Sequence, residues 1–122
     1  MKESITQTKS IAFSIRIIKL YKYLCSEKKE FVLSKQLLRS GTAIGALLME
    51  GEFAQSKADF INKFHIALKE ANESRYWLLL LVETDFISEV EHTSLKMDCE
   101  EIIKLLASSI KTAKANLSTK NQ

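Results

Sequence analysis

The chain has 122 residues, with 3 glycines, no proline and a formal net charge of +3. A chain of this length and average composition carries roughly 6 prolines and about 8 glycines. Because sandwiches and barrels need many turns, and turns are built largely from these two residues, the composition excludes those folds and favours a few long helices.

The first predicted helix covers residues 8–25. Its apolar residues recur at helical spacing rather than in the alternation of a strand. They are Ile11, Phe13, Ile15, Ile17, Ile18, Leu20 and Leu24. A charged run at residues 26–30 follows, has nothing apolar to bury, and ends the helix.

The second predicted helix covers residues 31–50 and carries two glycines on one face, Gly41 and Gly45. A glycine inside a helix costs about 1 kcal/mol relative to alanine. Two glycines on one face therefore indicate that the backbone of another helix approaches closely at this point.

The third predicted helix covers residues 57–84 and begins with a variant capping box, in which Ser56 caps the helix and Asp59 is its third residue. Its apolar stripe keeps the four–three spacing of bundle packing and is small at the centre. The small residues are Ala67, Ala71 and Ser74. We expect the two glycines of the second helix to pack against them.

The fourth predicted helix covers residues 88–117, with Ser88 and Glu91 as its capping box. Four helices joined by short connections predict an all-α, up-down-up-down antiparallel four-helix bundle. We place it in a single domain over residues 1–122. In this topology the fourth helix ends beside the start of the first.

Charge is distributed unevenly along the chain. Residues 1–25 carry a net charge of +4, residues 104–122 also carry +4, and the segment between them carries −5. Because the topology brings the two basic ends together, we expect one basic region that binds a polyanion such as RNA or DNA. Its residues are Lys9, Arg16, Lys104, Lys111, Lys114 and Lys120. The alternative is that these side chains only solvate the helix faces.

The segment 76–82 is apolar around nearly two turns of the third helix. A bundle helix buries only one stripe, so part of this segment is expected to form an exposed apolar patch, which usually marks a contact surface. The patch residues are Tyr76, Trp77, Leu79 and Leu80. We therefore predict a homo-oligomer. The alternative is that this helix is central or that the first helix covers the extra face.

The sequence holds no complete catalytic or metal-binding motif. Glu89 and His92 match half of a di-iron motif, but Asn62 stands where a pair with His65 needs a glutamate. Nucleophile-elbow, phosphate-loop and dinucleotide-binding motifs are missing as well. We expect no enzymatic activity, metal, cofactor or small-molecule substrate.

Cys25 and Cys99 match no metal-binding spacing. The N-terminus lacks the apolar stretch of a secretory signal, and the longest apolar run is far shorter than the about 20 residues that cross a membrane. We therefore expect a cytoplasmic protein with free thiols and no membrane contact. A disulfide between the two cysteines is the alternative.

Three segments of the second and third helices occur in a recognisable order and spacing. They are Gln36-Leu37-Leu38-Arg39, Ala43-Ile44-Gly45 and Lys69-Glu70-Ala71-Asn72-Glu73. Over about residues 13–117 the chain resembles the bacterial four-helix-bundle family of 23S rRNA intervening-sequence proteins. The resemblance implies a left-handed bundle, no enzymatic activity and, as in several members, a ring-shaped homopentamer.

The same resemblance extends to accessory proteins of diversity-generating retroelements, which form basic pentamers that engage a reverse transcriptase and nucleic acid. The family motif positions retained in this chain are Gln36, Arg39, Ile44, Glu50, Glu70 and Glu73. Many relatives carry Ser and Asn where this chain has Ala43 and Leu47, which removes two hydrogen-bonding groups near Glu50. From their positions beside the apolar stripes, we expect Glu70 to pair with Arg39; the alternative is that the motif acids are exposed.

Two functions follow from these patterns. The first is a non-enzymatic, homo-oligomeric bundle that binds nucleic acid or a ribonucleoprotein through clustered lysines, by phosphate contact rather than base readout. The second is a protein-interaction module in which the lysines only solvate the surface. Binding that weakens steeply with salt indicates the first, and a partner that survives nuclease treatment and high salt indicates the second.

Overall fold

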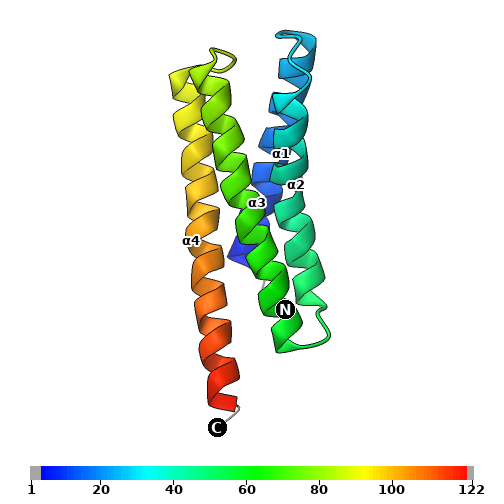
Figure 1. The fold of residues 1–122 in the computed structure, drawn as a ribbon, viewed down its shortest axis with the longest axis vertical. Coiled ribbons are helices and arrows are strands. Elements are labelled where there is room, and N and C mark those ends of the chain that lie inside the picture. Colours follow the sequence, from blue (N-terminus) through cyan, green and yellow to red (C-terminus); the bar gives the residue numbers. More distant parts are fainter. Residues whose placement is uncertain (1–3, 121–122) are drawn as a thin grey trace.

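The computed structural model describes residues 4–120, which form four helices (Figure 1). They are α1 (Ile5–Ser26), α2 (Leu33–Glu52), α3 (Lys57–Glu83) and α4 (Glu89–Lys120). Each helix packs against the next in the chain, and α4 also packs, less extensively, against α1. The all-α antiparallel four-helix bundle is therefore confirmed, and every helix begins and ends within three residues of its predicted limits. The left-handed arrangement of the four helices remains a prediction.

Local capping explains where the helices begin. Ser4 caps α1 by accepting a hydrogen bond from the backbone N–H of Gln7 at 3.2 Å, so this helix begins three residues before its predicted start. Ser56 and Ser88 cap α3 and α4 in the same way, as predicted. In the described part of the chain, no helix is long and apolar enough to span a membrane.

The core holds apolar side chains from all four helices. Its largest fully buried members are Phe13, Ile17, Leu24, Leu37, Ile44, Leu78, Leu81, Leu95, Ile102 and Leu106. Two polar contacts join the helices inside it: the Ser40 and Ser74 hydroxyls lie 2.8 Å apart, and the Cys99 thiol donates to the Ala71 carbonyl at 3.2 Å. Burial raises the pKa of Cys99 to about 12, which keeps this thiol protonated.

The two glycines of α2 face α1, so the prediction that they pack against the small residues of α3 is wrong. A Cβ on Gly41 would lie 3.0 Å from two side-chain carbons of Ile17. The backbone carbonyls at this face accept hydrogen bonds from α1: Ser14 Oγ donates to Gly41 and Gln7 Nε2 donates to Gly45, each at 3.3 Å. The missing side chains therefore let α1 reach the backbone of α2.

Glu30 lies in the charged run between α1 and α2, where the sequence suggested only solvated residues. The residue is 8% exposed, and its carboxylate accepts backbone N–H bonds from Val32, Leu33 and Ser34 at 3.2, 3.0 and 2.6 Å. Burial alone raises the pKa of the Glu30 carboxyl, but the N–H donors and the Ser34 hydroxyl outweigh burial and lower it. The ionised carboxylate therefore satisfies the free N–H groups that begin α2.

Replacing Glu30 by glutamine is expected to lower the free energy of unfolding by about 1–2 kcal/mol at neutral pH. Because the folded-state pKa is lowered, this stabilisation is fully present above the unfolded pKa of the carboxyl group and is lost as the pH falls through the lower, folded-state pKa. Urea unfolding at neutral and acid pH measures it. The control is Glu27→Gln, at an exposed position before the same loop. If the wild type remains more stable than the Glu30→Gln variant by the same amount at acid pH, the conclusion that an ionised Glu30 caps α2 is contradicted.

Candidate nucleic-acid interface

The start of α1 and the end of α4 lie toward the same end of the bundle, as predicted (Figure 1). Two of the bases of α1, however, pair with acids of α4. Lys9 Nζ lies 3.0 Å from Glu101 Oε1, and Arg16 Nη1 lies 2.6 Å from Asp98 Oδ2. Lys9 and Arg16 are therefore partly neutralised where they face α4, and a single basic region that joins them to the α4 lysines stays a prediction.

The α4 acids that face α1 lie on a different side of the helix from its lysines, whereas Glu100 lies among the lysines and pairs there with Arg75 of α3. Each residue turns the helix by about 100°, so the carboxylates that face α1 lie roughly 140–220° around from Lys96. Four lysines instead fall within an arc of about 80°. We call them the lysine row: Lys96, Lys104, Lys111 and Lys114, all exposed. Within residues 4–120, none of the four takes part in an ion pair.

The end of α4 strengthens this positive face. Residues 102–122 contain no aspartate or glutamate. The helix has 32 residues and its last turns extend beyond the neighbouring helices (Figure 1). The side chain of Lys120 lies outside the described residues. From Lys96 to Lys114 the row runs about 27 Å along the helix, so its charges add over a long surface.

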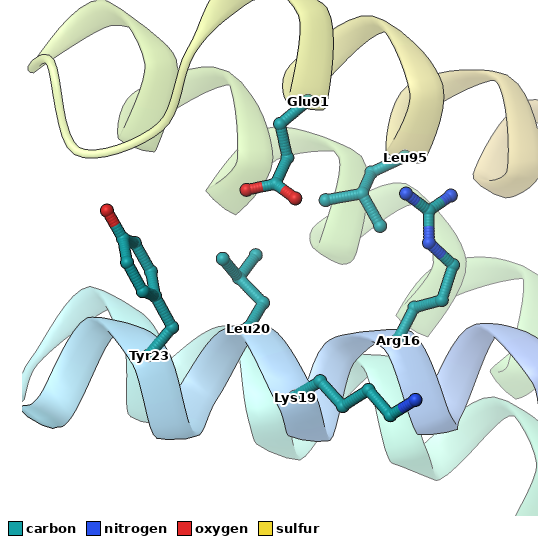
Figure 2. Close-up of a pocket in the computed structure, with 6 residues that line it drawn as sticks. All are labelled: Arg16, Lys19, Leu20, Tyr23, Glu91 and Leu95. Atoms are coloured by element: carbon teal, nitrogen blue, oxygen red, sulfur yellow. The ribbon is translucent and has the colours of Figure 1, made fainter. Parts of the chain in front are cut away.

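A groove of about 400 Å³ separates α1 from the first turns of α4 (Figure 2). Its lining residues are Arg16, Lys19, Leu20, Tyr23, Glu91 and Leu95. Figure 2 shows the Glu91 carboxylate directed into the groove, while the Lys19 ammonium turns away along α1. Because Arg16 is paired with Asp98 and the Glu91 carboxylate points into the groove, this groove is a less favourable site for phosphate than the exposed lysines of α4.

A second groove, of about 440 Å³, lies between α3 and α4 and is named here the α3–α4 groove. Its lining residues are Asn72, Arg75, Tyr76, Leu79, His92, Lys96 and Glu100. Arg75 is held by Glu100 Oε2 at 3.3 Å and by Asn72 Oδ1 at 2.9 Å. Lys96 therefore belongs both to this groove and to the lysine row. The sequence analysis did not identify Arg75 or Lys96 as candidate site residues. Lys96 could have been found from the helical spacing that places it on the same side of α4 as Lys104, Lys111 and Lys114.

Four of the family motif residues meet in a polar pocket of about 260 Å³ between α2 and α3. Gln36, Arg39, Glu70 and Glu73 line it together with Trp77. Burial, and then the neighbouring Glu73 carboxylate, raise the pKa of Glu70. The predicted Glu70–Arg39 ion pair is not among those in the described chain.

The other two motif residues lie elsewhere. Ile44 is buried in the core, and Glu50 lies 3.3 Å from Lys63 Nζ near the end of α2. The six motif positions therefore do not form one site.

The residues predicted for self-contact divide between two sides of α3. Tyr76 and Leu79 are 53% and 44% exposed and face the α3–α4 groove. Trp77 and Leu80 are half-buried, and Trp77 packs against the core and the α2–α3 pocket.

A second exposed apolar surface, longer than the Tyr76–Leu79 patch, lies on α1. Ile11, Ile15 and Ile18 are 44%, 48% and 38% exposed. Their spacing places them in one row, named here the isoleucine stripe. The wide apolar pattern predicted for the first helix is therefore divided in α1 between a face buried in the core and the outward face that carries the isoleucine stripe.

Comparison with known proteins gives one consistent result. The model of the family described as 23S rRNA-intervening sequence protein matches residues 2–108. A crystal structure from Bacteroides thetaiotaomicron, of a protein with unknown function from the S23 ribosomal protein family, is 57% identical, with a TM-score of 0.87. The match covers 88% of this chain and 99% of that one. No curated protein matches significantly.

Proposed function

Because this chain belongs to the 23S rRNA-intervening sequence protein family, we propose that it is a non-enzymatic, homo-oligomeric bundle that binds nucleic acid, free or in a ribonucleoprotein. The lysine row carries this proposal. Its four lysines are exposed, lie on one side of α4 and have no ion-pair partner among residues 4–120. Such a row neutralises phosphates without reading bases.

A mobility-shift assay with labelled RNA and DNA tests the proposal. We expect a shift at about 50 mM salt that weakens strongly at about 200 mM, because each phosphate contact releases counterions. No shift with either nucleic acid at the lower salt concentration contradicts it. A bound protein partner that resists nuclease and high salt, in the absence of a shift, supports the protein-interaction function instead.

Self-association fits the isoleucine stripe. Three exposed β-branched side chains in one row form an apolar surface of the kind that usually marks a contact. We propose that another copy of the chain covers this stripe, and that Tyr76 and Leu79 lie outside the contact between subunits. The number of subunits, five, rests on the family resemblance. Assembly multiplies the number of lysine rows and therefore the affinity for a long polyanion.

The substitution Ile15→Asp is expected to dissociate the oligomer, because it places a charge at the centre of the isoleucine stripe. Light scattering after size exclusion measures the mass. We expect a multiple of 13.9 kDa for the wild type and 13.9 kDa for the variant. Val90→Asp, at an exposed apolar residue in the first turn of α4, is the matched control. A wild-type monomer, or a variant of unchanged mass, contradicts the assignment.

A further inference from the structure

We propose that the α3–α4 groove holds one unpaired base of a single-stranded nucleic acid whose phosphates continue along the lysine row. This inference rests on the proposed function and adds to it a second kind of contact. The lysine row contacts phosphates and does not distinguish a duplex from a single strand. A base site makes that distinction, since the bases of a duplex are paired and stacked inside it.

The apolar part of the groove suits a base. The Tyr76 ring and the Leu79 side chain are about half exposed and line the same groove. A flat base can stack on an aromatic ring and exclude water from the apolar surface beside it. The volume of about 440 Å³ lies within the range of sites that bind small molecules, so the groove can accept a nucleotide.

The polar part of the groove suits the rest of the nucleotide. Arg75 is fixed between Glu100 and Asn72, which neutralises the one carboxylate of the lining and holds the guanidinium in place. Lys96 has no ion-pair partner within the described chain and lies at the same groove. The net charge of the lining is therefore positive, and His92 adds a further hydrogen-bonding group that a base edge or a phosphate can use.

The groove is continuous with the phosphate path. Lys104 and Lys111 follow Lys96 at about 12 and about 22 Å along α4 and on the same side. A strand that places a base on Tyr76 can therefore continue along these lysines toward the end of the helix. The groove between α1 and α4 also has a tyrosine, Tyr23, but the Glu91 carboxylate points into it (Figure 2). None of the four lysines of the row lines this groove.

Fluorescence anisotropy of the full-length protein tests the base site with three probes of equal length, a single-stranded RNA, a single-stranded DNA and a duplex. We expect tighter binding of the single strands. Tyr76→Ala should weaken single-strand binding about ten-fold and leave duplex binding unchanged. Tyr76→Phe should keep wild-type affinity because stacking needs the ring and not the hydroxyl. Tyr23→Ala, at another exposed tyrosine, is the control.

The outcomes separate this inference from the proposed function. Equal binding of single strands and duplex, unaffected by Tyr76→Ala, overturns the base site and leaves the lysine row standing. No binding of any probe overturns both. Equal loss for single strands and duplex, or a changed oligomeric mass in Tyr76→Ala, assigns this tyrosine a structural role and also overturns the base site. A difference between the RNA and DNA arms identifies which strand the site prefers.

Discussion

Replacing Lys104, Lys111 and Lys114 together by glutamine is expected to weaken binding of a single-stranded RNA by about ten- to hundred-fold at about 50 mM salt. These three residues make up most of the lysine row, and in the described chain no carboxylate pairs with them. The slope of the logarithm of affinity against the logarithm of salt concentration should fall by about 2, since each phosphate contact of a single strand contributes roughly 0.7. Anisotropy titrations across salt measure both effects.

The matched control removes the same charge from another part of the molecule. Lys28, Lys29 and Lys35 are exposed around the connection between α1 and α2. Their replacement by glutamine lowers the net charge of the chain by the same amount, from +3 to 0. We expect this control to retain most of the affinity and nearly the whole salt slope. Equal losses in the two triple variants mean that net charge alone attracts the RNA, which contradicts a defined lysine row.

Replacing Gly41 by leucine is expected to lower the free energy of unfolding by about 2–3 kcal/mol. A Cβ at this position would lie 3.0 Å from two carbons of Ile17, whose side chain is fully buried and branched at Cβ. Neither side chain can turn away, so α1 and α2 must separate. The Ser14 hydrogen bond to the Gly41 carbonyl, at 3.3 Å, is then lost as well. Urea unfolding measures the change.

Gly45→Ala provides the control for this effect. A Cβ at Gly45 meets its nearest neighbour, Gln7 Nε2, at 3.6 Å, which is an ordinary contact. Alanine is the better helix former, so this variant is expected to be more stable by about 0.5–1 kcal/mol. Destabilisation by both substitutions to a similar extent contradicts the conclusion that α1 and α2 approach each other most closely at Gly41 and not at Gly45.

The features that the sequence predicts correctly are local. Ser56 and Ser88 cap their helices because a cap needs only a side chain and an N–H three residues away. The helical stripes predict the bundle because the buried face of each helix repeats along its own sequence. The exposed Tyr76 and Leu79 follow from the same pattern, since the segment has more apolar residues than one buried stripe can hold.

The errors concern which helix each side chain faces. The spacing of Gly41 and Gly45 indicates a close approach but does not say whether α1 or α3 makes it. The pairing of Arg16 with Asp98 joins residues 82 positions apart and depends on the rotation of α4 about its axis. That rotation separates the acids that face α1 from the lysine row, while Glu100 stays beside the row and pairs with Arg75. The buried cap formed by Glu30 depends on how the connection folds back on α2, which its run of charged residues does not reveal.

Photo-cross-linking of a thiouridine-containing RNA to the wild-type protein, followed by mass spectrometry of the peptides, tests the central claim most directly. The lysine row and the α3–α4 groove predict cross-links within residues 96–114 of α4 and at Tyr76 on α3. Residues 9–16 of α1 should be nearly free of them, since Lys9 and Arg16 are paired with α4 acids. Cross-links concentrated on α1 or α2, or none at low salt, contradict the claim that α4 binds nucleic acid.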